Sequence, residues 1–278
     1  MGVLSVALIQ MRSCANENEN FLALEQLVRD SAKQGAYYIQ TPEMTGIVEK
    51  NPRKLLNAIG AQQNNAFFNK CSNLAKELGV WLHIGSNAVL AGDDKCFNRA
   101  CLFSPMGEPV CIYDKIHMFD ANLGAGNVWK ESARYIGGNR SVVANIEACD
   151  IGLAICYDLR FPQLFRQQAK MGAKILTCPA AFTKPSGEAH WEILLRARAI
   201  ENGAFMLAAA QGGVHEDGRE TYGHSMVVDP WGKIVAQLEH NEPGLLVCDI
   251  DLEEVEEARR KIPVLENEKK FSLTNISK

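Results

Sequence analysis

The segment Gly152–Phe165, GLAICYDLRFPQLF, places one cysteine between an apolar run and an expected helix start. Residues 152–156 read as a strand, and Pro162 suits the first position of a helix that runs to about Met171. Cys156 is therefore expected on a strand-to-helix turn, where backbone N–H groups favour a thiolate and can donate to an oxyanion. The alternative is a packed, inert thiol at the end of a strand.

The same alternation of strand and helix extends in both directions from this segment. Turns rich in Pro and Gly at 104–109 and 229–232 predict two hairpins, and residues 120–140 predict a long loop without regular structure. Strands are expected at 3–9, 37–39, 80–85, 99–103, 110–113, 141–146, 175–178, 205–210 and 245–250. Helices are expected at 21–31, 65–78, 188–201 and 253–261. This order indicates an α/β fold in which two sheets face each other with helices outside.

Bulk composition limits the class of protein. The chain has 278 residues, 47% of them apolar, which fits one large domain with a substantial core. Its formal net charge of -4 gives no electrostatic reason to expect nucleic acid or an anionic membrane as a partner. A small neutral or acidic metabolite is the expected ligand.

Targeting signals and metal motifs are missing from the pattern. No apolar run approaches the roughly 18 to 20 residues that span a bilayer, and the start of the chain lacks a basic export region, so a cytoplasmic protein is expected. The nine cysteines are an odd number without CxxC spacing, which indicates reduced thiols. Because HExxH and paired-cysteine spacings are absent, we expect neither metal nor cofactor.

Two charged residues stand where apolar strands are expected to end. Glu43 follows residues 37–42, and burial there would raise its pKa and make it a usable base. Lys115 ends the run 110–113, where its ammonium could meet a developing oxyanion, although a lysine that snorkels to solvent is the ordinary alternative. His117 could pair with Cys156 as in cysteine proteases, but a structural histidine is the competing interpretation.

Taken together, three motifs resemble a known family. The segments Thr41-Pro-Glu43, Tyr113-Asp-Lys115-Ile-His117 and GLAICYDLRFP around Cys156 resemble the nitrilase superfamily of carbon–nitrogen hydrolases, whose members use a Glu-Lys-Cys triad in this order. The resemblance extends to about Phe271, which implies one hydrolase domain over 1–271 and a polar tail at 272–278. Within the superfamily, the segments AHWEILLRARAIE (189–201), AAAQ (208–211) and YGHSMVVDPWG (222–232) are similar to the Nit branch, and there to the deaminated glutathione amidases.

The resemblance implies a fold, an assembly and a set of site residues. It implies a four-layer αββα sandwich and a homodimer or higher homo-oligomer, with an interface near the helix after Cys156 and the C-terminal segment. Cys156 would attack an amide carbon while Glu43 takes the thiol proton, and Lys115 and the Tyr157 N–H would stabilise the oxyanion. Glu131, which enters through the resemblance alone, would hold Lys115 or the substrate amide in register. Candidates for binding polar substrate groups are Arg160, Thr183 and His190.

The implied reaction is hydrolysis of the carboxamide C–N bond of a small carboxylate-bearing metabolite, through a thioester and with release of ammonia. The competing hypotheses within enzymes are an ω-amidase acting on 2-oxoglutaramate and an N-carbamoyl-amine hydrolase. A catalytically silent scaffold or binding protein is an alternative from another class, as is a thiol peroxidase or redox sensor. Neither of the last two explains why all three charged or nucleophilic residues occur in matching segments.

Overall fold

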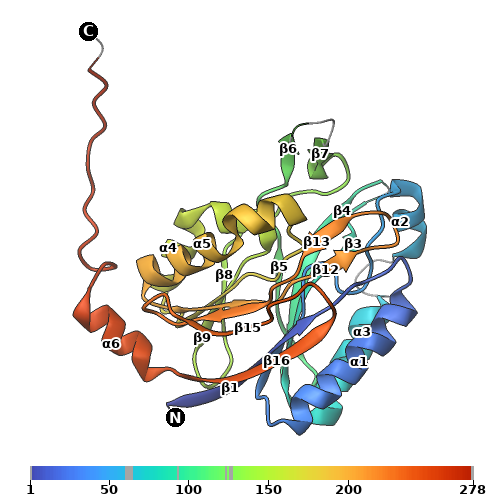
Figure 1. Ribbon diagram of the computed structural model, residues 1–278, viewed down its shortest axis with the longest axis horizontal. Coiled ribbons are helices and arrows are strands. Elements are labelled where there is room, and N and C mark those ends of the chain that lie inside the picture. Colours follow the sequence, from blue (N-terminus) through green and yellow to red (C-terminus); the bar gives the residue numbers. More distant parts are fainter. Residues whose placement is uncertain (1, 60–64, 93, 123, 125–127, 277–278) are drawn as a thin grey trace.

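The computed structural model describes residues 2–59, 65–92, 94–122, 124 and 128–276. Two six-stranded sheets face each other, with helices on their outer faces (Figure 1). In spatial order the first sheet contains β16 (Gly244–Asp251), β1 (Val3–Gln10), β2 (Tyr38–Gln40), β3 (Trp81–Leu90), β4 (Cys96–Phe103) and β5 (Pro109–Asp114). The second contains β15 (Ile234–Gln237), β14 (Met226–Val228), β11 (Phe205–Ala208), β10 (Ile175–Thr177), β9 (Asp150–Leu153) and β8 (Val142–Asn145).

Two pairs of helices form the outer layers. On the first sheet, α1 (Glu17–Lys33) and α3 (Ala66–Leu78) bury Leu24, Val28 and Phe67 against strand residues such as Ile39. On the second sheet, α4 (Pro162–Lys170) and α5 (Lys184–Asn202) lie side by side (Figure 1). The shorter helices are α2 (Pro52–Ala58) and α6 (Glu253–Lys261). The layers confirm the expected αββα sandwich.

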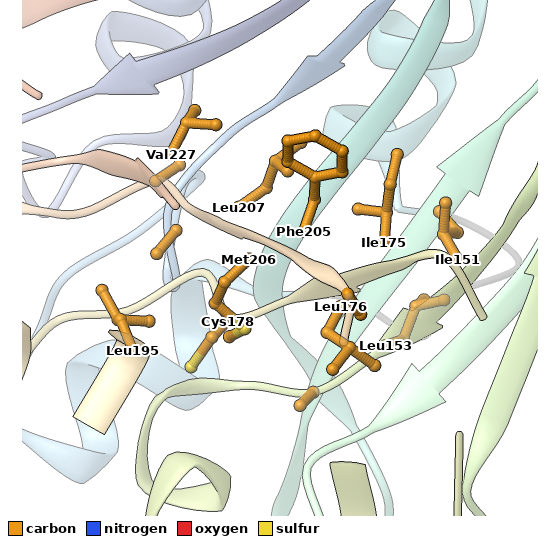
Figure 2. Close-up of a cluster of buried hydrophobic side chains, with 14 of the residues drawn as sticks. Ile151, Leu153, Ile175, Leu176, Cys178, Leu195, Phe205, Met206, Leu207 and Val227 are labelled. Carbon is orange, nitrogen blue, oxygen red and sulfur yellow. The ribbon is translucent and has the colours of Figure 1, made fainter. Parts of the chain in front are cut away.

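The alternation of side chains along the strands explains why the sheets need cover on both faces. Ile175 pairs with Phe205 and Leu176 with Met206 in the parallel pair β10–β11, so like-facing apolar side chains stack across the strands. Figure 2 shows these side chains on both sides of the second sheet, with Leu195 of α5 among them. One continuous apolar cluster thus joins the two sheets to α5.

Local signals set the ends of the helices. The Asn16 side chain accepts hydrogen bonds from the first turn of α1, as an N-cap should. Gly79 ends α3 with φ of 65°, a left-handed conformation that glycine adopts without a Cβ penalty. Pro162 is the first residue of α4, as expected from its position in the sequence.

The structure confirms most predicted elements, including the hairpins at 104–109 and 229–232. The prediction of an irregular loop over 120–140 was wrong in part: β6 (Asp120–Asn122) pairs with β7 (Val128–Lys130), and a 3-10 helix, η2 (Glu131–Ala133), follows, whereas residues 134–140 are irregular as expected. These strands have three residues each, too short to produce a periodic pattern. Residues 123 and 125–127 of this segment lie outside the described residues.

Two further boundaries differ from expectation, and two features were not predicted. β9 ends at Leu153, and Cys156 begins a 3-10 helix, η3 (Cys156–Arg160), instead of completing the strand. α5 begins at Lys184, four residues earlier than predicted, because Pro185 and Gly187 are tolerated in its first turn. The helix α2 was not predicted from the sequence. Neither was the hairpin formed by β12 (Gly212–Val214) and β13 (Glu220–Tyr222).

Candidate active site

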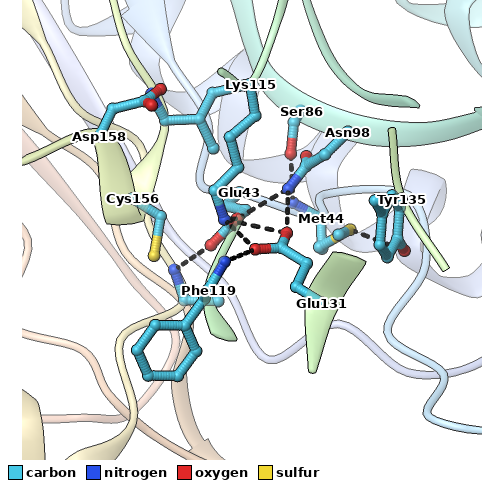
Figure 3. A network of polar contacts seen from close by, with 12 residues as sticks. Glu43, Met44, Ser86, Asn98, Lys115, Phe119, Glu131, Tyr135, Cys156 and Asp158 are labelled. Carbon is cyan, nitrogen blue, oxygen red and sulfur yellow. Dashed lines mark hydrogen bonds and ion pairs between the residues drawn. The ribbon is translucent and has the colours of Figure 1, made fainter. Parts of the chain in front are cut away.

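Four of the predicted site residues line one cavity at the ends of strands from both sheets. Glu43 follows β2, Lys115 follows β5, Cys156 follows β9, and Glu131 begins η2 just after the β6–β7 hairpin. The first and last of these residues, Glu43 and Cys156, are 113 positions apart in the sequence, yet the facing sheets bring all four side chains together. Figure 3 shows their side chains converging on one another.

Glu43 is buried and held by donors from three directions. Its Oε1 accepts hydrogen bonds from Lys115 Nζ at 2.9 Å and Asn98 Nδ2 at 2.8 Å, and its Oε2 accepts one from the backbone N–H of Ala181 at 2.8 Å. The turn that carries it lies directly against β3: a Cβ on Gly85 would lie 2.1 Å from the Thr41 carbonyl oxygen. A side chain at position 85 would therefore displace the turn that presents Glu43.

Glu131 supplies the second carboxylate. Lys115 Nζ lies 3.0 Å from its Oε1 and 2.9 Å from its Oε2, so the ammonium sits between two carboxylates. The backbone N–H of Phe119 donates to Glu131 Oε2 at 2.6 Å, which links η2 to the segment after β5 that carries Lys115. The structure therefore places Glu131 beside Lys115, in the position that the resemblance implied.

Cys156 occupies an unusual backbone conformation. Its φ is 49°, in the left-handed region that non-glycine residues adopt only at a cost. Its N–H donates to the Pro179 carbonyl at 2.9 Å, and Asp158 Oδ2 accepts from the Ile155 N–H at 2.9 Å, so hydrogen bonds on both sides fix the turn. Strained residues of this kind cluster at functional sites.

Asp158, which the sequence did not single out, organises this turn. It is fully buried and accepts hydrogen bonds from Tyr113 Oη, the His117 backbone N–H and His117 Nδ1, at 2.6, 3.0 and 2.7 Å. The His117 ring also stacks on Phe161 with centroids 3.5 Å apart. His117 thus binds the turn that carries Cys156 rather than pairing with the thiol, which supports the structural interpretation of this histidine.

The three central groups differ in protonation. Burial opposes the charge on Glu43, but the Lys115 charge and hydrogen bonds from Cys156, Lys115 and Asn98 outweigh it and lower the Glu43 pKa. Burial likewise opposes the charge on Lys115, and Glu131 and Glu43 outweigh it and raise the Lys115 pKa well above its usual value. Burial and the adjacent Glu43 raise the pKa of Cys156 well above its usual value. At neutral pH the site holds a carboxylate, an ammonium and a neutral thiol.

Two expectations about charge are corrected by this arrangement. Burial was expected to raise the pKa of Glu43, but the ammonium and three donors reverse the direction. The turn was expected to favour a thiolate at Cys156, but the neighbouring carboxylate and burial favour the thiol. The site is therefore arranged for proton transfer from Cys156 to Glu43 rather than for a preformed thiolate.

Tyr157 N–H is free to donate. It lies in the first turn of η3, where backbone N–H groups have no partner within the helix, and no acceptor for it occurs among the described residues. It adjoins the residue that carries the thiol. The expected oxyanion donor thus has the required free hydrogen.

The predicted substrate-binding residues are distributed unequally. Arg160 and Thr183 line the cavity, but His190 is exposed on α5 and outside the cavity wall. Its Nδ1 lies 3.3 Å from Arg160 Nη2, so it contacts the cavity only through that arginine. The structure does not bring His190 to a substrate.

The sequence analysis missed several residues that line the cavity or hold its acids. Asn98 of β4 donates to both Glu43 and Glu131, the latter at 3.3 Å, and no nearby motif marks it. Two more arginines, Arg134 and Arg219, line the cavity, as does Trp129. Trp129 and Arg134 lie in the segment 120–140 that was predicted to be a loop, and Arg219 lies in 211–221, for which no element was predicted. Charged residues in such segments are ordinarily solvated.

Comparison with known proteins shows the family of this chain. The carbon-nitrogen hydrolase family model matches residues 5–260. The chain belongs to the carbon-nitrogen hydrolase family, the nitrilase superfamily. Among curated relatives, deaminated glutathione amidase from Mus musculus is 39% identical over 267 residues, which cover 94% of this chain and 82% of that protein.

Solved structures give the same result. The C. elegans NitFhit protein has a TM-score of 0.89 and 32% identity, and the match covers 96% of this chain and 65% of that longer one. An amidase from Nesterenkonia sp. AN1 has a TM-score of 0.79 and 26% identity over 93% of this chain and 94% of that one. In that crystal structure the acetamide moiety of fluoroacetamide is attached at the active-site cysteine. The chain is thus a Nit-branch hydrolase that acts on C–N bonds.

Two further features bear on ligands. The described part of the chain contains no group of three or more His, Cys, Asp or Glu side chains placed to hold a metal ion. None of the helices in the described ranges is long and apolar enough to cross a membrane.

Proposed function

We propose that this chain is an amidase in which Cys156 is the nucleophile, Glu43 the general acid and base, and Lys115 and the Tyr157 N–H the oxyanion donors. The observation that carries the proposal is the buried contact set of Glu43, Lys115 and Glu131 beside the Cys156 thiol. In the described residues around this site, each of the two acids and the ammonium has a partner, the Cys156 thiol donates to Glu43, and the Tyr157 N–H has no acceptor.

The protonation states define the first step. Glu43 takes the thiol proton as sulfur attacks the amide carbon, and the carbonyl oxygen becomes an oxyanion beside Lys115 and the Tyr157 N–H. Because the pKa of Glu43 is lowered and that of Cys156 is raised, this transfer is unfavourable before substrate arrives. When sulfur bonds to the amide carbon, the negative charge moves to the carbonyl oxygen, where Lys115 and the Tyr157 N–H stabilise it. Proton transfer from Cys156 to Glu43 therefore becomes favourable only as the C–S bond forms. This protects the free enzyme from unwanted thiol chemistry.

The remaining steps return each group to its starting state. The tetrahedral intermediate collapses to a thioester as Glu43 gives its proton to the departing nitrogen. Water then loses a proton to the same carboxylate as it attacks the thioester, and a second oxyanion forms in the same place. This intermediate collapses as the C–S bond breaks, and Glu43 returns the proton to the Cys156 sulfur. The products are a carboxylic acid and an amine or ammonia. Glu131 contacts Lys115 throughout, which keeps the ammonium in position while Glu43 gains and loses its proton.

The proposed substrate is deaminated glutathione, as in the relative at 39% identity. In this compound the amide nitrogen carries a cysteinylglycine group, so the leaving group is a dipeptide amine. Ammonia would leave only from a primary carboxamide such as 2-oxoglutaramate. Arg160 and Thr183, which line the cavity near the nucleophile, are suited to the polar 2-oxo acid end that both compounds share.

Steady-state kinetics test this proposal. The values of kcat/KM are compared for deaminated glutathione, 2-oxoglutaramate and an N-carbamoyl amine, with Cys156→Ala as the control for contaminating activity. The highest value is expected for deaminated glutathione, and no turnover is expected from Cys156→Ala. A higher value for 2-oxoglutaramate would assign the chain as an ω-amidase, and consumption of peroxide with a reductant in place of amide hydrolysis would indicate a thiol peroxidase.

We also propose that residues 1–271 act as a single domain and that two copies associate. One apolar cluster runs through both sheets, which supports a single domain. Met171, which directly follows α4, and Ile193 of α5 are 63% and 69% exposed, and Phe271 and Leu273 are exposed on the C-terminal segment, which extends away from the sheets (Figure 1). Apolar surface of this kind favours association. Nine free cysteines support a reducing, cytoplasmic location.

A further inference from the structure

A second cationic group lines the active-site cavity. Arg219 lies on the turn between β12 and β13 and faces the same cavity as Cys156. Its side chain is 15% exposed, so it is largely withdrawn from water. His215 links the β12–β13 hairpin to the rest of the protein. Its Nδ1 contacts the Ser13 carbonyl and its Nε2 contacts Thr221 Oγ1 of β13, both at 2.8 Å. The guanidinium is therefore presented from a fixed support.

The hydrogen-bonding capacity of Arg219 is not satisfied within the protein. Its Nη2 forms an ion pair with Asp217 Oδ2 at 3.4 Å, but Asp217 Oδ2 and Arg219 Nε are both buried without a hydrogen-bond partner among the described residues. Buried donors of this kind normally have an acceptor, and their exceptions often occur at binding sites. A guanidinium has five N–H donors in a plane that matches a carboxylate.

Aromatic contacts connect Arg219 to the nucleophile. The guanidinium lies over the Trp129 ring at 5.4 Å, Trp129 contacts Phe119 with centroids 5.9 Å apart, and Phe119 contacts Tyr157 at 5.1 Å. Tyr157 adjoins Cys156. Arg219 thus lies three ring contacts away from the nucleophile along one cavity wall. A carboxylate that reaches Arg219 must be separated from the reacting carbonyl by several bonds.

We infer that Arg219, held over Trp129, binds the carboxylate at the far end of the leaving group and makes the enzyme selective for extended amides. This inference rests on the proposed amidase function. Deaminated glutathione has such a carboxylate on the glycine of its leaving group, whereas 2-oxoglutaramate has no group beyond the amide nitrogen. Arg160 binds the 2-oxo acid end of the acyl group, and Arg219 binds the carboxylate of the leaving group. The two arginines thus recognise opposite ends of one substrate.

The test is a cycle that varies both the enzyme and the substrate. Parent and Arg219→Met enzymes are assayed with deaminated glutathione and with its C-terminal glycinamide, which lacks only the distal negative charge. We expect Arg219→Met to lower kcat/KM for the acid by about 10- to 100-fold, mainly through KM, as expected for loss of a charge-assisted hydrogen bond. With the glycinamide we expect a loss of less than about threefold, because the interaction is absent from both complexes.

Control variants separate this role from a structural one. Arg29→Met removes a charge from an ion pair on α1, away from the cavity, and should leave both substrates unaffected. Arg219→Lys keeps the positive charge but lacks the planar guanidinium, so its kcat/KM for the acid should lie between the values of the parent and of Arg219→Met. If Arg219→Met does not fold, the comparison of Arg219→Lys with the parent decides the question. Equal losses on acid and glycinamide, or no loss on either, would overturn the inference.

The proposed function and this inference fail in different ways. If the parent enzyme does not hydrolyse deaminated glutathione, the proposed substrate is wrong and the inference is wrong with it. If the parent hydrolyses it and the cycle shows no dependence of the Arg219 effect on the distal carboxylate, only the inference is wrong.

Discussion

At the residue scale, a buried ammonium between two carboxylates determines the chemistry beside Cys156. Lys115 is 2% exposed and contacts both Glu43 and Glu131, so its charge is compensated in a region with little water. A buried charge with one partner removed is strongly destabilising, which explains why a second carboxylate accompanies it. Glu43 can then accept a proton from Cys156 while Glu131 still balances Lys115.

The protonation states predict a broad pH profile. Activity requires ionised Glu43, whose pKa is lowered from 4.5, and protonated Lys115, whose pKa is raised well above 10.5. We therefore expect kcat/KM to fall in acid only below about pH 4.5 and in base only above about pH 10.5, within the range where the protein stays folded. Rates measured across this range with deaminated glutathione test the expectation.

The same profile identifies the role of Glu131. Burial disfavours the Lys115 charge, and the charges of Glu131 and Glu43 counter it. Glu131→Gln should therefore move the alkaline limb to lower pH while the acid limb, set by Glu43, changes little. An unchanged alkaline limb in this variant would show that Glu131 does not maintain the charge on Lys115.

At the element scale, the 3-10 turn η3 and its buried anchor Asp158 position the nucleophile. The sequence predicted a strand, a turn and a helix here, and it placed Cys156 on the turn correctly. It could not reveal that Cys156 adopts φ of 49°, or that Asp158 gathers donors from Tyr113 and His117, which are more than 40 residues away. Such long-range hydrogen bonds leave no periodic signal in one sequence.

Removal of the anchor should destabilise the turn. Asp158→Ala leaves buried donors on Tyr113, His117 and Ile155 without an acceptor, so we expect a loss of about 2–4 kcal/mol in the free energy of unfolding. Urea denaturation followed by fluorescence measures it. The matched variant Tyr113→Phe removes one of these donors and should cost about 1 kcal/mol. A loss for Asp158→Ala no larger than that for Tyr113→Phe would contradict the anchoring role.

The remaining differences at this scale also have physical causes. Glu43, Lys115 and Cys156 could be proposed from the sequence because each follows an apolar strand and lies in a segment that resembles a family motif. Asn98, Arg134 and Arg219 could not, because each is a common polar residue whose neighbours in space lie elsewhere in the chain. The β6–β7 and β12–β13 hairpins were missed since three-residue strands carry too few alternations to detect.

At the scale of the whole molecule, the facing sheets bring four separate chain segments to one cavity. Polar side chains also connect the two sheets: Gln40 Oε1, at the end of β2, accepts from the Ala209 N–H beyond β11, at 2.9 Å. Gln10 Oε1 accepts from the N–H and hydroxyl of Ser225, both at 2.9 Å. These bonds fix the registry of the sheets, and with it the relative positions of Glu43 and Cys156.

The proposed dimer makes a prediction at this scale. A double variant with Met171→Glu and Ile193→Glu places charges at the end of α4 and on α5, where both native side chains are exposed in the single chain. We expect the parent to sediment as a dimer and the double variant as a monomer, because burial of two carboxylates at an interface is unfavourable. The matched variant Leu22→Glu changes an exposed side chain of α1, and this variant should sediment as a dimer. A monomeric parent at all concentrations would contradict the proposal.

The most direct test of the central claim is the mass of the enzyme during turnover. Enzyme mixed with deaminated glutathione, quenched in acid and analysed intact should carry one 2-oxoglutaryl group, and digestion should locate it on the peptide that contains Cys156. The adduct should be absent from Cys156→Ala and reduced at early times in Lys115→Met, by about 10²- to 10³-fold in its rate of formation. Hydrolysis by Cys156→Ala, or an acyl group located on another residue, would contradict the account.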